Sequence, residues 1–312
     1  ETTVGVLPFY HIYGMTIILS MALRCGATVV TMPKFEMEDF CALVEEHDIE
    51  SGYLVPPIIV GLAKSPVVDE YDLSSFDYIT SGAAPLGKDV AKACADRIGC
   101  MVKQGYGLTE TSPVTHLVSR DDEVVLDSVG HAVPNTEFRV VDVQTREDVA
   151  PGERGEILIR GPQVMRGYLK RPDATADTID ENGWLHTGDV AKVDEEERVY
   201  IVDRVKELIK YKGHQVAPAE LEAILRSHPK IGDAAVIPSP DEEAGEVPKA
   251  FVVKAPESDD LTAAEVMAFV AERVAPQKKV RRVAFTDEIP KTASGKILRR
   301  ELVEHERAEQ TG

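Results

Sequence analysis

The sequence is poor in cysteine, in aromatic residues and in basic side chains. Its four cysteines contain no C-x-x-C pair, which argues against a zinc knuckle or a disulfide framework and is typical of a reducing cytoplasm. We expect all four to be buried: Cys25, Cys41, Cys94 and Cys100. The 35 Lys+Arg against 54 Asp+Glu give a net charge of −19. Such a surface repels phosphate backbones and anionic lipids, so neither nucleic acid nor a membrane surface is expected as a partner.

The chain also lacks an uninterrupted apolar run of membrane-spanning length. The stretch from Gly5 to Leu23 is broken by Pro8 and His11 and stopped by Arg24, which favours a buried strand, turn and helix over a span of ~20 residues. The first residue is Glu1, with no initiator Met or leader pattern before the apolar stretch that follows. We expect the chain to begin inside a domain.

The 312 residues correspond to about two domains at roughly 150 residues each. In the first part, short apolar runs alternate with helical patterns, which predicts a parallel α/β sheet. The expected strands are Thr3–Leu7, Ala27–Met32, Ser51–Val55, Tyr78–Thr80 and Met101–Gln104, and the expected helices are Met15–Leu23, Glu38–Glu46, Pro57–Ala63 and Lys88–Ile98.

The pattern changes twice along the rest of the chain. From about residue 128 to 203, short strands separated by Gly and Pro turns predict a small antiparallel or barrel-like unit. Residues 204–312 show a compact α+β pattern, in which Ser239–Val247 and Pro256–Asp260 are expected as loops. We therefore expect two parts, 1–203 and 204–312, the first divided into an α/β sheet (about 1–127) and the β-rich unit (about 128–203).

The stretch Gln104–Glu110 directly follows a predicted strand. Its glycines allow a ligand to approach the backbone, Tyr106 offers a flat face for a base, and Thr109 and Glu110 offer oxygen atoms to phosphate and Mg²⁺. Open α/β sheets place their ligands at the carboxyl ends of parallel strands. A tight glycine turn around a core tyrosine is an equally simple interpretation.

Two further stretches contain small residues and a carboxylate. Ser81–Leu86 also follows a strand, and its small side chains leave room beside them, although a strand-to-helix turn explains them equally well. In Gly183–Asp189, a glycine turn presents a carboxylate that can accept hydrogen bonds from a ribose diol. We expect Trp184 to pack in a core and His186 to be structural.

Two charged stretches follow in the C-terminal part. Asp203–Gly213 mixes charges with β-branched residues at the expected domain junction, as a hinge would, or as a solvated hairpin would. The Ser294-Gly295-Lys296 sequence near the C-terminus does not complete a phosphate-binding loop, because Ile297 follows the lysine. Lys296 can still neutralise a phosphate, with a basic tail as the alternative.

The five stretches in this order resemble the adenylate-forming superfamily of acyl- and aryl-CoA synthetases, luciferases and adenylation domains, over essentially the whole chain. Within it, the sequences LPFYHIY, YDLSS, SGAAPLG, GWLHTGD and IVDRVKELIKYKGHQVAPAELE look most like 4-coumarate:CoA ligases and their bacterial relatives. The resemblance implies that a carboxylic acid is activated with Mg·ATP to an acyl-adenylate and transferred to CoA. It also implies an AMP-binding domain followed by a mobile C-terminal lid.

The resemblance also assigns roles to residues. It places Gly82, Ala83, Gln104, Gly105 and Tyr106 at the nucleotide, Thr109 at the α-phosphate, Glu110 at Mg²⁺, Asp189 and Arg204 at the ribose, and Lys296 at the charge that develops during adenylation. For the transfer to CoA it implies a hinge at Lys206, catalytic assistance from Lys210 and Gln215, and a pantetheine path along Lys212 and Gly213. His11 would act at the acyl entrance, and Tyr13, Gly82, Gly105, Pro113 and Val114 would line the acid pocket.

Three interpretations of the activity are open. Besides an aryl-CoA ligase, the pocket residues would suit a medium- or long-chain fatty acyl-CoA synthetase. The phosphate loop that relatives carry before the LPFYHIY stretch is absent from this chain, so we expect the chain alone to bind the β- and γ-phosphates poorly. The third interpretation is therefore a non-catalytic protein that binds adenylates or a partner.

Overall fold

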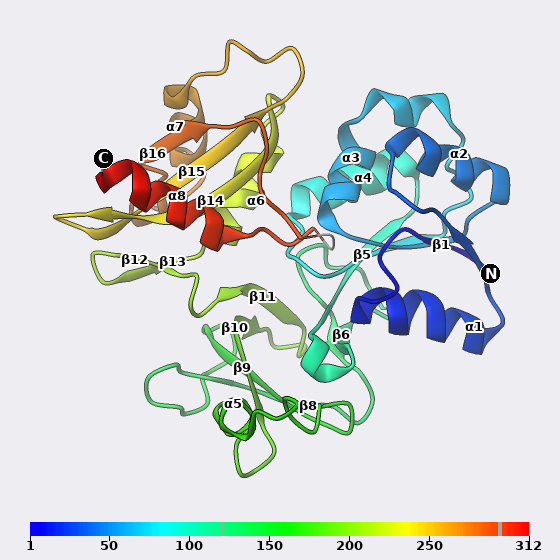
Figure 1. Ribbon diagram of the computed structural model, residues 1–312, viewed down its shortest axis with the longest axis horizontal. Helices are drawn as coiled ribbons and strands as arrows, with labels where there is room; N and C mark the ends of the chain where they lie inside the picture. Colours follow the sequence, from blue (N-terminus) through cyan, green and yellow to red (C-terminus); the bar gives the residue numbers. More distant parts are fainter. Residues whose placement is uncertain (120–121, 293–294, 312) are drawn as a thin grey trace. The chain divides into compact units, whose positions relative to one another are not determined.

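The computed structural model describes residues 1–119, 122–292 and 295–311 (Figure 1). They form two compact units, Glu1–Ile201 with Gly295, and Val202–Thr292 with residues 296–311. Each unit has its own apolar core, the first around Phe40 and Ile79 and the second around Leu221 and Val236. In the described part of the chain, every helix is too short or too polar to cross a bilayer.

The first unit contains a seven-stranded sheet of order β2-β1-β3-β4-β5-β6-β7. The strands are β1 (Thr2–Gly5), β2 (Thr28–Thr31), β3 (Ser51–Leu54), β4 (Tyr78–Ser81), β5 (Met101–Gly107), β6 (Val114–Leu117) and β7 (His131–Ala132). The five strands from β2 to β5 pair in parallel, and β6 and β7 continue the sheet antiparallel. The parallel part confirms the α/β class, because parallel neighbours need crossover connections.

Helices connect these strands and cover the sheet. They are η1 (Tyr13–Met21), α1 (Ala22–Cys25), α2 (Met37–His47), α3 (Pro56–Lys64), η2 (Pro66–Glu70) and α4 (Lys88–Ile98). Figure 1 shows α2, α3 and α4 on one side of the strands and α1 on the other. The bounds of α4 match the prediction, and its apolar residues at helical spacing are buried: Val90, Ala91, Cys94 and Ile98.

A second sheet has the order β11-β10-β9-β8 and belongs to this unit except for the end of β11, from Val202 on. Its strands are β8 (Glu137–Val141), β9 (Gly155–Arg160), β10 (Leu185–Val193) and β11 (Val199–Arg204), and β9 pairs antiparallel with both β8 and β10. The short elements η3 (Thr109–Thr111) and α5 (Pro172–Thr178) lie in the connections. Ile157 and Ile159 of β9 are fully buried, so this sheet has a separate core.

The second unit has the predicted α+β character. Its sheet has the order β13-β12-β15-β14, and β16 pairs in parallel with β15. The elements are β12 (Ile209–Tyr211), β13 (His214–Val216), α6 (Pro218–Ser227), β14 (Ile231–Asp241), β15 (Gly245–Lys254), α7 (Ala263–Ala271), η4 (Pro276–Lys278), β16 (Arg282–Phe285) and α8 (Arg299–Thr311). A capping box between Thr262 and Glu265 starts α7.

Two local expectations are wrong. Most of Ser239–Val247 is strand rather than loop, because Ser239 pairs with Val247 in the hairpin of β14 and β15. The prolines of β14 are tolerated because this strand ends the strand order and its outer edge needs fewer donors. Of the four cysteines, Cys25 is exposed and Cys100 is only partly buried. The residue type alone did not reveal which side of its element each thiol occupies.

Candidate active site

The first group of candidate residues lies where β4 and β5 end. Gly82 and Ala83 follow β4 directly. Residues 104–107 of the stretch Gln104–Glu110, for which a tight glycine turn was one interpretation, form the second half of β5. Beyond Gln104, β5 exchanges its parallel neighbour for the antiparallel β6. Because β4 and β5 are parallel, their carboxyl ends meet at one edge of the sheet, as in other open α/β sheets that bind ligands there.

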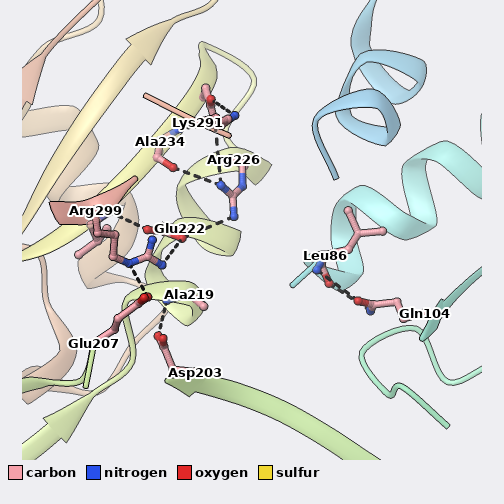
Figure 2. A network of polar contacts seen from close by, with 12 residues as sticks. Leu86, Gln104, Asp203, Glu207, Ala219, Glu222, Arg226, Ala234, Lys291 and Arg299 are labelled. Atoms are coloured by element: carbon pink, nitrogen blue, oxygen red, sulfur yellow. Dashed lines mark hydrogen bonds and ion pairs between the residues drawn. The ribbon is translucent and has the colours of Figure 1, made fainter. Parts of the chain in front are cut away.

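Gln104 supports the loop that follows β4. Its buried amide donates to the Leu86 carbonyl and accepts from the Leu86 N–H, both at 3.2 Å, as Figure 2 shows. This pair of hydrogen bonds holds the segment that carries Gly82 and Ala83 against β5. The side-chain amide of Gln104 therefore satisfies the N–H and the carbonyl of Leu86. The expected contact of Gln104 with a nucleotide stays a prediction.

One hydrogen bond joins the stretch Gln104–Glu110 to the stretch Gly183–Asp189. The hydroxyl of Tyr106 donates to Oδ2 of Asp189 at 2.6 Å, although 83 positions separate the two residues. Asp189 is 5% exposed and lies on β10, so residues 185–189 are strand where a glycine turn was expected. A carboxylate has about four lone-pair sites, so accepting from Tyr106 leaves acceptor capacity for further hydroxyl groups.

The backbone around Asp189 is held by neighbouring side chains. The register of β10 shifts between His186 and Val190, and Gly188 at this irregularity has a φ of +70°. The N–H of Gly188 donates to Glu156 Oε1 at 3.0 Å, and the hydroxyl of Thr187 accepts from the Asp189 N–H at 3.0 Å. The bulge therefore presents Asp189 in a fixed orientation.

Glu110 and Thr109 lie on the single turn of η3. The phenol of Tyr168 donates to Glu110 Oε1 at 2.7 Å, and the Met165 N–H donates to the Glu110 carbonyl at 2.7 Å. Among the described residues, no group of three or more acidic, His or Cys side chains forms a metal cage. One carboxylate is nevertheless the kind of protein ligand that Mg²⁺ uses when nucleotide phosphates complete its coordination, so Glu110 fits that role.

Tyr13 and Gly82, both expected in the acid pocket, are in direct contact. A Cβ at Gly82 would lie 2.9 Å from Cε1 of Tyr13, so only glycine fits beside the ring. The Tyr13 hydroxyl donates to the Thr80 carbonyl at 3.1 Å, and desolvation raises the Tyr13 pKa above its usual value. His11 Nδ1 accepts from the Tyr13 N–H at 3.2 Å. The structure therefore brings His11, Tyr13 and Gly82 together.

The other expected pocket residues lie where β5 meets β6. A Cβ at Gly107 would lie 2.0 Å from the Pro113 carbonyl oxygen, and one at Gly105 would lie 3.2 Å from the side chain of Leu117. Val114 begins β6 and pairs with Gly107. The glycines of β5 are thus needed for close strand approach, and any contact of Gly105, Pro113 and Val114 with an acid stays a prediction.

In the second unit, β12 and β13 bring Lys210 and Gln215 together. The two residues are direct cross-strand partners, so their side chains share one face of the hairpin. Lys212 and Gly213 form its tip, both with positive φ. Lys212 is exposed and forms an ion pair with Glu243, while the Lys210 N–H donates to Glu246 at 2.7 Å. The candidates for CoA therefore lie on one small hairpin.

Arg204, Lys206 and Lys296 are all exposed. The Glu207 N–H donates to the Arg204 carbonyl at 3.0 Å, which closes a turn that contains Lys206. The Lys296 N–H donates to the hydroxyl of Thr292 at 3.1 Å, and its carbonyl accepts from the Thr292 N–H at 2.9 Å. Residues 293 and 294 of this stretch lie outside the described residues.

Family models match both parts of the chain. Residues 1–169 match the AMP-binding enzyme family, and residues 220–296 match the AMP-binding enzyme C-terminal domain. The chain belongs to the AMP-binding enzyme family. This finding confirms the resemblance on which the residue roles were based, because the first match alone covers more than half of the chain.

Curated relatives of this AMP-binding chain are named 4-coumarate–CoA ligases. The protein of that name from Pinus taeda is 48% identical over 302 residues, which are 95% of this chain and 56% of the relative. The 4-coumarate:CoA ligase 1 of Petunia hybrida is also 48% identical, over 95% of this chain and 55% of the relative. The chain thus spans about half the length of these relatives.

Solved structures confirm the AMP-binding fold. ATP-bound MatB from Rhodopseudomonas palustris aligns with a TM-score of 0.89 and 28% identity, covering 98% of this chain and 60% of that chain. The o-succinylbenzoate CoA synthetase MenE from Bacillus subtilis, in complex with its acyl-adenylate intermediate, aligns with a TM-score of 0.82 and 29% identity, covering 97% of this chain and 60% of its own.

Sequence reasoning missed three supporting residues of the AMP-binding unit. Tyr168 holds Glu110, and Glu156 holds the bulge before Asp189. His116 pairs with Tyr106 across the strands, is fully buried, and bonds through Nδ1 to the Thr115 hydroxyl at 3.0 Å. Burial lowers the pKa of His116 to about 3. No spacing pattern marks these residues, since each acts on a neighbour brought close by folding.

Proposed function

We propose that this chain carries the adenylate-forming apparatus of an acid–thiol ligase, which activates a carboxylic acid with ATP and transfers the acyl group to CoA. The hydrogen bond between Tyr106 and buried Asp189 carries the proposal, because it joins a flat ring and a carboxylate of the kind that base and ribose recognition need. The AMP-binding part would span 1–203, and the mobile lid 204–312.

In the first half-reaction, an oxygen of the substrate carboxylate attacks the α-phosphorus of ATP and pyrophosphate leaves. Tyr106, with Gly82, Ala83, Gln104 and Gly105, would bind the base, and Asp189 and Arg204 the ribose. Thr109 would meet the α-phosphate, and Glu110 would hold Mg²⁺, which supplies charge neutralisation on the phosphates. The ammonium of Lys296 would lower the barrier where the carboxylate and phosphate charges crowd together.

In the second half-reaction, the thiol of CoA attacks the acyl carbonyl, the bond to the phosphate oxygen breaks, and AMP leaves. Lys210 and Gln215, which share one face of their hairpin, would act beside the thiol. Lys212 and Gly213 at the tip would line the pantetheine path. A hinge at Lys206 would exchange the Lys296 segment for this hairpin between the two half-reactions.

The acid is proposed to be a planar aryl acid of the 4-coumarate type. The contact between Gly82 and the ring of Tyr13 supports this, since it forms a flat surface without a Cβ. Pro113 and Val114 would complete the pocket, with His11 at its entrance. The names of the relatives support the same substrate class. A cytoplasmic location is proposed with it, because an exposed free thiol such as Cys25 suits a reducing compartment.

The test uses the full-length protein that carries this chain. It is incubated with ATP, Mg²⁺, CoA and a mixed panel of cinnamic, benzoic and fatty acids, and acyl-CoA is measured by mass spectrometry. We expect hydroxycinnamoyl-CoA, and a loss of roughly 100- to 1000-fold in Lys296→Ala. Product from alkanoic acids alone would establish a fatty acyl-CoA synthetase instead. No product from any acid would leave adenylate binding without turnover.

A further inference from the structure

Charged side chains hold both ends of the segment that carries Lys296. At one end Lys291 forms an ion pair with Asp233, and at the other Arg299 pairs with Glu222 at 3.1 Å. Between them, Lys291 and Ile297 form a β-bridge, and the Leu298 N–H donates to the Pro290 carbonyl at 2.9 Å. Two charged anchors, Lys291 and Arg299, therefore lie on either side of Lys296 in the sequence, and Figure 2 shows both.

The anchor at Arg299 is buried. The Arg299 side chain is 14% exposed and the Glu222 side chain 3% exposed. The other oxygen of Glu222 accepts from the Val236 N–H of β14 at 2.8 Å, which fixes the carboxylate between α6 and β14. A guanidinium that pairs with such a fixed carboxylate has little freedom to move. Arg299 thus fixes the start of α8 three positions after Lys296.

The same guanidinium also reaches the turn around Lys206. Its Nε lies 3.0 Å from a carboxylate oxygen of Glu207, the residue after Lys206. Asp203 holds the other side of this turn, because its carboxylate accepts from the Ala219 N–H at 2.8 Å and from the Arg204 N–H at 2.7 Å. The residue at the end of the Lys296 segment therefore contacts the expected hinge through its side chain.

We propose that Arg299 is a positioning residue, which sets the place of Lys296 and links it through Glu207 to the turn that contains Lys206. The inference rests on the proposed function for its effect on catalysis. A planar guanidinium can hydrogen-bond one carboxylate in a fixed direction, here Glu222, while its charge attracts a second, here Glu207, whereas an ammonium acts as a point charge. Arg299 is thus required for the half-reaction that uses Lys296 and dispensable for the one that uses Lys210 and Gln215.

The experiment compares the two half-reactions in Glu207→Gln and Arg299→Lys variants of the full-length protein. Acyl-adenylate formation from ATP and acid is measured separately from thioester formation on supplied acyl-adenylate. We expect the first rate to fall about tenfold and the second to change less than about twofold, because small displacements of a reacting group cost rate. A merely structural role would lower both rates together, and that result would overturn the proposal.

Matched controls lie on the same helix. Arg300 is 90% exposed and pairs with Glu304 at 2.7 Å, so Arg300→Lys and Glu304→Gln make the same chemical changes without touching the anchor. Both controls are expected to keep wild-type rates in both half-reactions. Equal losses in controls and test variants would overturn the proposal. Because Glu207 is partly exposed, Glu207→Gln is expected to fold even where changes at Arg299 do not.

Hydrogen exchange tests the anchor without any activity. The Thr292 and Leu298 amides donate hydrogen bonds within the segment, so the Glu207→Gln and Arg299→Lys variants should speed their exchange about tenfold, while the Ala235 and Phe251 amides of the sheet keep wild-type rates. Unchanged exchange at Thr292 and Leu298 would overturn the proposal. If the wild-type protein activates no acid, the proposed function fails, and this measurement still decides whether Arg299 holds the segment.

Discussion

The two units position their chemical groups by different means. In the first, strand register and close backbone approach bring side chains together, as in the bond between Tyr106 and Asp189 and the contact of Gly107 with the Pro113 carbonyl. In the second, ion pairs do so, because Arg299 contacts both the buried Glu222 and the partly exposed Glu207. One arrangement depends on backbone geometry and the other on charge balance.

This difference predicts different vulnerabilities. A buried charge that loses its partner stays desolvated and uncompensated, so changes in the second unit should cost more than their surface area suggests. Positions set by strand register should respond mainly to added volume and to the loss of single hydrogen bonds. The two units should also respond to acid in opposite directions.

The largest effect is expected at Arg299. Arg299→Met leaves the buried carboxylate of Glu222 facing only the more distant guanidinium of Arg226 among the described ion pairs, at 3.8 Å, and should lower the free energy of unfolding of the second unit by about 3–5 kcal/mol. Urea unfolding followed by exchange of the β14 amides measures the change. Arg300→Met, which removes an exposed ion pair, should cost less than about 1 kcal/mol. An equal loss of unfolding free energy in Arg299→Met and Arg300→Met would mean that the burial of Arg299 does not make its ion pairs more important for stability.

The next largest effect is expected from acid, which should change the stability of the two units differently. The pKa of His116 is lowered to about 3 by burial, so the folded first unit lacks a proton that the unfolded chain binds below the usual value of 6.5. Its stability should fall on the order of 3 kcal/mol as pH drops from 6.5 towards 3. The only tryptophan, Trp184, lies in this unit, so its fluorescence during urea unfolding reports the effect. A His116→Phe variant should lose this pH dependence.

Asp203 should give the second unit the opposite dependence of stability on pH. Burial raises its pKa to about 6, against the attraction of its hydrogen bonds and of Arg299, so the folded second unit keeps a proton that the unfolded chain releases above 3.8. The contribution of Asp203 to stability should therefore rise as pH drops from 6 to 4. Exchange of the Ala219 amide, which bonds to Asp203, measures it, with Asp203→Asn as the variant without a slope. The same sign for both residues would contradict the assigned protonation states.

A smaller, steric effect is expected at Gly107. The added Cβ of Gly107→Ala would meet the Pro113 carbonyl at 2.0 Å, so β5 and β6 must separate, at a cost of about 2 kcal/mol to the first unit. The fluorescence of Trp184 during urea unfolding measures the loss. Gly99→Ala is a control with a strained backbone but open space around the new Cβ. A larger cost at Gly99 would show that backbone strain outweighs close approach in this unit.

The smallest effect is expected at Tyr106. Tyr106→Phe keeps the ring and removes the donor to Asp189, which should cost about 1 kcal/mol of stability. Calorimetric titration with AMP should show weaker binding by roughly fivefold, because Asp189 loses the bond that orients it. Tyr200→Phe removes a comparable, part-buried hydrogen bond to Asp194 in the same unit and should leave AMP binding unchanged. Unchanged affinity in Tyr106→Phe would remove the main support for the proposed function.

Some elements could be predicted because their signals are local. The bounds of α4 match because helical periodicity is uninterrupted there. β10 was not expected, since Gly188 and neighbouring polar residues conceal a strand that bulges to present Asp189. The β14–β15 hairpin was missed because its prolines are typical of loops, and only its place in the strand order makes them acceptable.

The sequence by itself determined the α/β class, the change of secondary-structure pattern from one part of the chain to the next, and the motifs from which the family was identified. These depend on residue type and short-range spacing, which the chain displays directly. Only the tertiary structure decided that Tyr106 meets Asp189, that Tyr168 holds Glu110, and that Arg299 lies between Glu207 and Glu222. Each of these contacts joins residues far apart in the chain, and strand register and burial, rather than local propensity, bring them within bonding distance.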